Sequence, residues 1–405
     1  MHNPWDERFA QRTQAMKASA IRELLKLSSK PGYISFGGGF PAPEVFPVET
    51  FRQACDTVLQ VNGQTALQYG VTEGVLELRE MIAQRSNRYG MNVSPENVLV
   101  TSGSQQALDL IGKIFINRGD RILVESPTYL GALQAWNAYG AQYISVPSDE
   151  NGMMTEHLET ALQQKPKFIY VLPNFQNPTG VTISLERRKR IVELANQYGV
   201  FIVEDDPYGQ LRFEGEHLPA VEVLDCQMRN SPDVYDGNVL YLGTFSKIMA
   251  PGLRLAWIIA PREVIHKMSL AKQGTDLHTS TFSQYVACEV GKGDFLDQHI
   301  KKICQVYRER RDVMLEALEE HFPRGIQWTH PQGGLFLWVT LPPGMNARKV
   351  LEESVKEKVV IIPGDSFFPN GGGENTMRLN FSNATPQMIN EGIHRLGHVL
   401  HKMMQ

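Results

Sequence analysis

Short apolar runs alternate with amphipathic segments through the middle of this 405-residue chain. The runs are rich in Val, Ile and Leu, which predicts buried strands, and the segments between them carry apolar residues at helical spacing. Two such helices are predicted over 105–116 and 185–198, and Gly199 ends the second. Strands that alternate with helices predict an α/β fold around a mostly parallel, seven-stranded sheet. The predicted strands are 98–100, 121–124, 143–146, 168–171, 200–203, 239–242 and 255–259.

Beyond about residue 290 the pattern changes. A long charged helix is predicted over 295–321, followed by strands over 334–339, 359–362 and 377–381, which together indicate a smaller α+β domain. The first thirty residues are typical of a polar arm leading into a helix, and the next segment, 34–47, is a loop rich in Gly and Pro. We therefore expect three parts. They are an N-terminal arm and helix that join the small domain (1–47), a large domain (48–290) and a C-terminal small domain (291–405).

Composition and charge exclude several classes of function. The content of hydrophobic residues is 42% and the net charge is −4, with the basic residues scattered, so neither nucleic-acid nor membrane-surface binding is favoured. The four cysteines lie far apart without zinc-ligand spacing, which predicts reduced thiols and no metal site. The N-terminus lacks a signal-peptide core, and no apolar run approaches the roughly 18 residues of a membrane span. We expect a cytoplasmic protein.

Lys247 stands between two predicted buried strands, at a turn of small hydroxyl residues. A partly desolvated lysine loses part of its preference for the charged form and becomes a nucleophilic amine. Such an amine forms a Schiff base with an aldehyde, of which pyridoxal 5'-phosphate (PLP) is the commonest example. Thr244, Ser246 and Arg254 flank it with groups suited to a phosphate. An ordinary solvated lysine in a strand connection remains open at this point.

Other polar residues follow the ends of the first predicted strands, where ligands bind in sheets of this kind. Ser104 and Gln105 begin a predicted helix after the first strand, and free backbone N–H groups there would form an anion site. Tyr129 follows the second strand and could stack on a flat cofactor. A plain N-cap serine and a core tyrosine are the alternatives for these positions.

Three further candidates lie later in the chain. Asn177 precedes Pro178, which holds it extended so that its amide can address one fixed atom. Asp205 ends a buried strand, where a carboxylate needs a partner; a protonated pyridine nitrogen would supply one, and capping of the next turn is the alternative. Arg378 lies in an alternating strand and offers a bidentate clamp for a carboxylate.

These pieces together resemble a known family. The stretches TSGSQQAL, NFQNPTG, EDDPY, TFSK followed after six residues by Arg, and MRLNFS occur in the order and spacing of the class I/II PLP-dependent aminotransferases of fold type I. The chain is most similar to the group of 2-aminoadipate and kynurenine aminotransferases, which includes broad-specificity aromatic and branched-chain transaminases. The resemblance extends over essentially the whole chain.

The resemblance implies a role for each matching residue. Lys247, Asp205 and Tyr129 form the catalytic set: the lysine binds the cofactor aldehyde, the aspartate pairs with the pyridine nitrogen, and the tyrosine stacks on the ring. The residues implied to bind the cofactor are Ser104, Gln105, Tyr129, Asn177, Asp205, Tyr208, Thr244, Ser246, Lys247, Arg254 and, from a second subunit, Tyr69. Arg378, Asn177 and Gly39 are implied to hold the substrate α-carboxylate, and Arg22 the distal carboxylate of an acidic donor. Tyr69 acting across subunits implies a homodimer with shared active sites.

The implied function is ping-pong transfer of an amino group from an L-amino acid (2-aminoadipate, glutamate, aromatic or branched-chain) to a 2-oxo acid such as 2-oxoglutarate. Three alternatives stay open, because motifs shared by the whole fold do not fix the reaction. The first is a PLP-dependent lyase, decarboxylase or cyclopropane-forming synthase. The second is a regulator that couples such a domain to a DNA-binding domain. The third is a PLP-binding module without catalytic activity.

Overall fold

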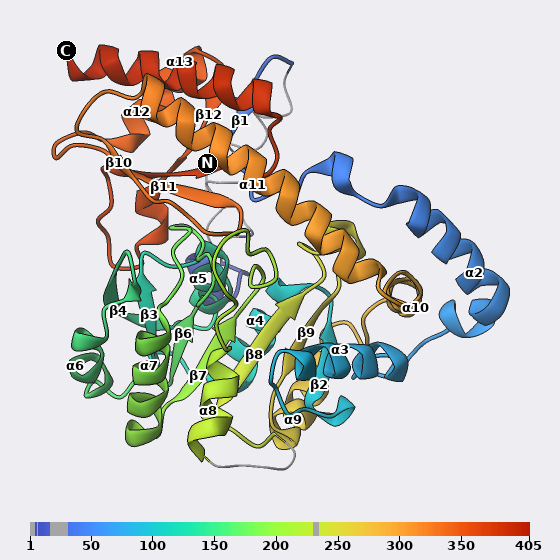
Figure 1. Cartoon of the computed structure of the whole chain (residues 1–405). Coiled ribbons are helices and arrows are strands. Elements are labelled where there is room, and N and C mark those ends of the chain that lie inside the picture. The colour runs from blue at the N-terminus through green and yellow to red at the C-terminus, as the bar shows by residue number, and fades with distance from the viewer. Residues whose placement is uncertain (1–4, 6, 17–30, 230–234) are drawn as a thin grey trace.

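The computed structural model describes residues 5, 7–16, 31–229 and 235–405, and its main body is an eight-stranded sheet in the order β2-β9-β8-β7-β6-β3-β4-β5 (Figure 1). All seven predicted strands are present, and a short edge strand, β5, adds to them. The pairs β3–β4, β3–β6, β6–β7 and β7–β8 are parallel, whereas β9 runs antiparallel to β2 and β8. The strands are β2 (Val98–Thr101), β3 (Arg121–Ser126), β4 (Gln142–Asp149), β5 (Gly152–Met153), β6 (Phe168–Val171), β7 (Phe201–Asp205), β8 (Val239–Thr244) and β9 (Ala256–Ile259).

Helices cover both faces of this sheet, which explains why its strands are almost uniformly apolar. On one face, Leu108, Trp136 and Met268 from three helices pack against the strands; these helices are α4 (Ser104–Phe115), α5 (Leu130–Asn137) and α9 (Arg262–Gln273). On the other face lie α6 (Leu158–Leu162), α7 (Leu185–Tyr198) and α8 (Val221–Arg229).

Helix α7 shows how the sequence sets its own boundaries. The side chain of Ser184 accepts a hydrogen bond from the Arg187 N–H at the start of the helix. Gly199 ends it in the left-handed conformation, with φ of 66°, which glycine adopts without steric cost. The predicted helix over 185–198 is thereby confirmed.

Two smaller sheets lie above the large one in Figure 1. The first has four antiparallel strands in the order β10-β11-β14-β13, and the second pairs β1 with β12 in parallel. The single strand predicted over 359–362 is wrong, because the chain changes sheets at Ile361, so that β12 pairs with β1 and β13 with β14. The strands are β1 (Ile34–Ser35), β10 (Gln327–Trp328), β11 (Phe336–Thr340), β12 (Val359–Val360), β13 (Ile362–Pro363) and β14 (Thr376–Asn380).

The predicted long helix is confirmed as α11 (Phe295–His321), which packs along α13 (Pro386–Met404) beside α12 (Ala347–Lys356). A separate group, at the right of Figure 1, packs α10 (Thr281–Val290) against α2 (Val48–Ala66) and α3 (Leu76–Arg88). The expected division at residues 47 and 290 stays a prediction. Among the described residues no helix combines the length and apolarity needed to cross a bilayer, and no cluster of His, Cys, Asp and Glu is arranged to hold a metal.

Candidate active site

A cavity of about 430 Å³ opens where the parallel strands of the large sheet end. Because β9 runs antiparallel to its neighbours, its first residue meets the last residue of β8, and Arg254 is brought to the same edge. Within the part of the chain that the structure describes, the cavity is lined by every predicted site residue except Tyr69. These lining residues are Gly39, Ser104, Gln105, Tyr129, Asn177, Asp205, Tyr208, Thr244, Ser246, Lys247, Arg254 and Arg378.

Lys247 reaches into the cavity from the turn after β8, and its Nζ donates a hydrogen bond to the Gly39 carbonyl at 2.8 Å. Burial lowers the pKa of Lys247 to about 8, and the positive charges of Arg378 and Arg254 contribute to this lowering. An amine with this pKa exchanges a proton near neutral pH and has a substantial neutral, nucleophilic fraction. This environment is the partly desolvated one predicted from the sequence.

Asp205 is the last residue of β7 and is 3% exposed. Its Oδ2 accepts a hydrogen bond of 2.8 Å from the Tyr170 hydroxyl. Burial raises the pKa of Asp205 to about 7, the bond from Tyr170 acts to lower it, and the neighbouring Asp206 raises it. A buried carboxylate of this kind is stabilised by a cationic partner in the cavity.

Asp206, the neighbouring carboxylate in the chain, does not line this cavity. It accepts hydrogen bonds from the Asn174 amide, the Gly209 N–H and the Tyr241 hydroxyl, and it borders a different cavity. Of the two neighbouring carboxylates, only Asp205 therefore shares a cavity with Lys247, and Asp205 is the one that the sequence analysis names as a candidate.

Arg378 projects from β14 and is 2% exposed. It donates to the Asn177 side-chain oxygen at 2.7 Å and to the Gly37 carbonyl at 2.6 Å, whereas its Nε has no partner within the described structure. The rings of Phe336 and Phe367 flank the guanidinium, with centroids 4.2 and 5.2 Å from it. Burial lowers the pKa of Arg378 to about 10. The arginine is thus held rigidly and keeps donor capacity for an anion.

Another part of the lining is the start of α4 at Ser104, which follows Gly103 with φ of 88°. A Cβ at Gly103 would collide with the Arg254 guanidinium, so a glycine is required for the arginine to approach the helix start. The N-terminal N–H groups of a helix together with a guanidinium form an anion site. Gln105 donates from its amide to the Gly131 carbonyl, and the Thr244 hydroxyl accepts from the Ser246 N–H.

Tyr129 and Tyr208 also line the cavity. Tyr129 caps α5, and Tyr208, which hydrogen-bonds with Asn177, is 4% exposed. Burial raises the pKa of both phenols, so both stay neutral donors near neutral pH.

One described residue of the predicted site does not line the cavity. Tyr69 is 78% exposed and lies edge-on to the His278 ring. Arg22 lies outside the described residues.

The sequence analysis missed the residues that hold the predicted ones. Tyr170 supports Asp205, and Phe336 and Phe367 enclose Arg378. Tyr170 lies within an apolar run. The only signal for its role is that a buried tyrosine hydroxyl needs a partner, and its strand, β6, pairs with β7, which ends at Asp205.

The charges of the cavity suit PLP. Among the described residues of the lining, Lys247, Arg254 and Arg378 provide three cationic groups against the single carboxylate of Asp205. This excess favours a ligand with phosphate and carboxylate groups. The residues present therefore match a phosphate at α4, an aldehyde at Lys247 and a protonated ring nitrogen at Asp205.

Comparison with known proteins decides the family. Residues 39–396 match the family described as aminotransferase class I and II. The chain belongs to this family. Among similar proteins, Aromatic-amino-acid aminotransferase 1 of Thermococcus litoralis is 47% identical over 99% of this chain and 96% of its own length.

Two solved structures have the same fold. The α-aminoadipate aminotransferase LysN of Thermus thermophilus, complexed with N-(5'-phosphopyridoxyl)-L-leucine, has a TM-score of 0.92 and 40% identity, and 99% of each chain is covered. The kynurenine aminotransferase of Pyrococcus horikoshii, in complex with PMP, has a TM-score of 0.93 and 44% identity, covering 100% of this chain and 99% of the other. The predicted fold type I architecture, PLP cofactor and transamination are confirmed, and the lyase and regulator alternatives gain no support.

Proposed function

We propose that this aminotransferase accepts both apolar or aromatic and acidic L-amino acids, with a 2-oxo acid such as 2-oxoglutarate as acceptor. The observation that carries the proposal is the composition of the cavity lining. A buried guanidinium, Arg378, lies between the rings of Phe336 and Phe367, and the lining also includes Phe40 and Leu130. An apolar or aromatic side chain fits this lining without a further charged partner.

The names of similar proteins support the same breadth. The relatives are described as acting on aromatic amino acids, on α-aminoadipate and on kynurenine. An acidic donor needs a second cation for its distal carboxylate. In the described lining the only guanidiniums are those of Arg254 and Arg378, and we assign these to the phosphate and the α-carboxylate. We therefore keep Arg22 as the residue that recognises the distal carboxylate.

The experiment is a panel of donors assayed with 2-oxoglutarate for the wild type, Arg22→Ala and a control, Arg190→Ala, which removes a half-exposed arginine of α7. We expect kcat/KM for 2-aminoadipate and glutamate to fall about ten-fold or more in Arg22→Ala, because a charge-assisted contact is lost. Leucine and phenylalanine should be nearly unchanged, and so should all donors in the control. A uniform loss across donors, or no loss, refutes the role of Arg22.

We assign the chemistry of the reaction to residues of the cavity. PLP, when bound, supplies an aldehyde that takes up the amino group and a ring that withdraws electrons from the reacting carbon. With PLP bound, Lys247 would take the proton from the α-carbon of the amino acid and deliver it to the former aldehyde carbon of the cofactor, which its pKa of about 8 permits near neutral pH. Arg378 and Asn177 fix the α-carboxylate, and Asp205 keeps the ring nitrogen protonated.

We further propose a cytoplasmic homodimer in which Tyr69 completes the partner's active site. In support, exposed apolar side chains occur along α2, at the start of α3 and in the segment between them, which contains the exposed Tyr69. They are Val48, Leu59, Val61, Leu67, Val71 and Leu76. All four cysteines are free, which accords with a reducing compartment.

Mixing two inactive variants tests the shared site. If Tyr69 acts across the interface, a dimer of one Lys247→Ala chain and one Tyr69→Ala chain contains one intact site. Random re-association of equal amounts makes about half of the dimers mixed, so activity should return to roughly a quarter of the wild-type value. No recovery in a mixture proven to contain mixed dimers would place Tyr69 in its own chain's site.

A further inference from the structure

A buried lysine, Lys272, lies near the end of α9 and does not line the active-site cavity. Its side chain is fully buried. Its Nζ donates to the two carboxylate oxygens of Asp276 at 2.8 and 2.9 Å and to the side-chain oxygen of Gln106 at 2.8 Å. The three hydrogens of the ammonium thus have three acceptor atoms, which a buried charge requires.

The partners of Lys272 in turn hold Ser102, a residue of the loop between β2 and α4. The Ser102 N–H donates to the Gln106 side-chain oxygen at 2.7 Å, and the Ser102 hydroxyl donates to Asp276 Oδ2 at 2.8 Å. Both acceptor atoms also accept from Lys272. The backbone and the side chain of Ser102 are therefore each linked to the buried ammonium through a single shared atom.

The position of Ser102 bears on the anion site at the start of α4. Gly103 follows it with φ of 88°, and the Arg254 guanidinium lies so close to Gly103 that a Cβ there would collide with it. The helix N-terminus and this guanidinium are the groups that we assign to the PLP phosphate. Neither Ser102 nor the residues that hold it line the cavity, so they can affect the phosphate only through the shape of this loop.

Neither charge nor stability accounts for the ion pair. Burial acts to raise the pKa of Asp276, and the hydrogen bonds from its three partners lower it below the ordinary value, so the carboxylate is ionised at neutral pH. An ammonium and a carboxylate in contact have no net charge and add little attraction for a phosphate. A buried ion pair also contributes little to stability, because the cost of removing both charges from water offsets their attraction. What such a pair provides is a fixed direction for the hydrogen bonds made to it.

We propose that Lys272, Asp276 and Gln106 are positioning residues for the phosphate of the cofactor. They fix Ser102, so that the N–H groups at the start of α4 and the Arg254 guanidinium converge on one anion. The inference rests on the proposed assignment of the phosphate to these groups. It adds residues outside the cavity, on α9, on the inner part of α4 and in the segment that follows α9, to those that determine how tightly PLP is bound.

The test compares PLP with pyridoxal, which has a hydroxyl in place of the phosphate. Each is titrated into the apoenzyme, and its binding is followed by absorbance. Lys272→Met keeps the length of the side chain and removes the ammonium. We expect the dissociation constant of PLP to rise about ten-fold and that of pyridoxal to stay unchanged, because only PLP uses the positioned N–H groups. Ser102→Ala, which removes the hydroxyl contact to Asp276, should change the two constants in the same selective way by about five-fold.

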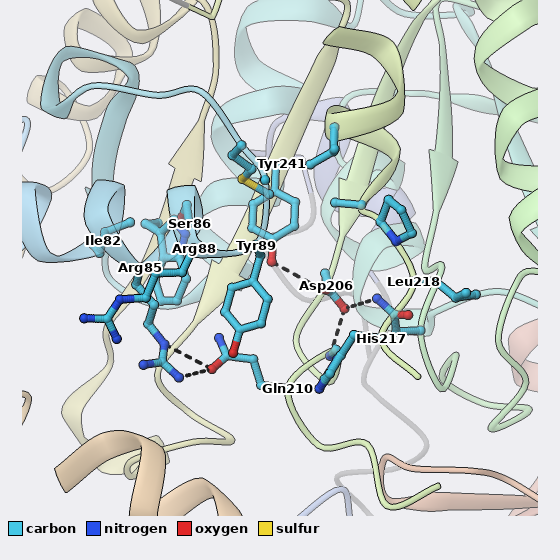
Figure 2. Close-up of a pocket in the computed structure, with 18 of the residues that line it drawn as sticks. Ile82, Arg85, Ser86, Arg88, Tyr89, Asp206, Gln210, His217, Leu218 and Tyr241 are labelled. Atoms are coloured by element: carbon cyan, nitrogen blue, oxygen red, sulfur yellow. Dashed lines mark hydrogen bonds between the residues drawn. The ribbon is translucent and has the colours of Figure 1, made fainter. Parts of the chain in front are cut away.

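Arg85→Met is the matched control. Figure 2 shows Arg85 of α3 beside Gln210 in a second cavity, of about 400 Å³, which Asp206 also lines. The Arg85 side chain is 12% exposed and its Nη1 donates to Asp297 at 2.6 Å. The control therefore removes another largely buried cation from its carboxylate partner, away from the loop at Ser102, and should leave the affinities for both PLP and pyridoxal unchanged.

The outcomes separate a positioning role from a merely structural one. A loss shared equally by PLP and pyridoxal, or no loss, in a folded Lys272→Met variant overturns the proposal; if that variant does not fold, Ser102→Ala decides in the same way. Arg254→Gln tests the assignment of the phosphate and should weaken PLP about ten-fold or more without affecting pyridoxal. An unchanged PLP affinity in Arg254→Gln would place the phosphate elsewhere, whereas a selective loss in Arg254→Gln alone would keep that assignment and remove the positioning role.

Discussion

Replacement of Lys247 by methionine should stabilise the apoenzyme at pH 7, although it abolishes activity. Lys247 is charged in the unfolded chain at this pH, and in the folded chain the charge is buried near Arg378 and Arg254. Methionine has a similar length and no charge, so it fills the same space without this penalty. For the same reason, a protein with its native active-site residue is commonly less stable than a variant with an inert residue at that position.

The magnitude follows from the pKa of Lys247, about 8 in the folded chain against 10.5 ordinarily. One pKa unit corresponds to about 1.4 kcal/mol, so the charged form costs the fold about 3 kcal/mol at pH 7. Methionine also loses the hydrogen bond to the Gly39 carbonyl, which contributes about 1 kcal/mol. The expected net gain is about 2 kcal/mol. Between pH 8 and 10.5 the folded chain binds fewer protons at this residue than the unfolded chain, so the stability of the wild type rises with pH and the gain shrinks.

The assay is urea denaturation of both apoenzymes at pH 7 and at pH 10, at one protein concentration. We expect the difference in unfolding free energy to fall from about 2 kcal/mol at pH 7 to near zero at pH 10, because the penalty on the wild type shrinks to about 1 kcal/mol there. Lys113→Met, at an exposed position of α4, is the control and should show no such pH dependence. A difference that stays constant with pH, or a variant less stable than the wild type at pH 7, would refute the burial of a charged amine.

Three further predictions concern the same cavity. Asp205→Asn should keep most of the cofactor but lose most of the rate of proton transfer, and Asp206→Asn should not; the reverse order in single-turnover absorbance measurements would exchange the two assignments. Arg378→Ala should raise KM for every amino and oxo acid by roughly ten- to a few-hundred-fold, the loss of a charge-assisted clamp, and an effect confined to acidic substrates would contradict this role. Tyr170→Phe removes a hydrogen bond that lowers the pKa of Asp205, so the pH below which PLP affinity falls should rise by about one unit. Tyr143→Phe is the control and should leave that pH unchanged. An unchanged pH in Tyr170→Phe would show that Tyr170 does not lower the pKa of the aspartate.

Much of the fold could be predicted because its strongest signal is local. Strands buried on both faces must be apolar throughout, so seven of them were identified from the sequence. The strand predicted over 359–362 failed for the opposite reason. Its four residues are all buried and look alike in sequence, and only their partners, Ile34 in β1 and Arg378 in β14, divide them between two sheets. Pairing partners far apart in the chain are not encoded in local hydrophobicity.

A site residue could be predicted from the sequence where burying its charged side chain would cost free energy unless a ligand supplied a partner. A lysine at a buried turn and an aspartate at a buried strand end are of this kind, and the structure brings Lys247 and Asp205 to one cavity. Residues that only support others carry no such cost. Tyr170, Phe336 and Phe367 look like ordinary core aromatics until the neighbouring strands place them against Asp205 and Arg378.

The three consecutive acids of the EDDPY stretch show why spacing alone cannot assign such roles. Along a strand, alternate residues point to opposite faces, so Glu204 and Asp206 are directed away from the face of Asp205. Glu204 accepts from the Val221 and Glu222 N–H groups at the start of α8, an anion position that a helix N-terminus favours. Asp206 turns to the second cavity, and Asp205 alone faces Lys247. Burial raises the pKa of all three, and the charge of Asp206 raises the pKa of Glu204 and of Asp205 further. Strand geometry therefore gives each carboxylate its own hydrogen-bond donors, although the repulsion between neighbours remains.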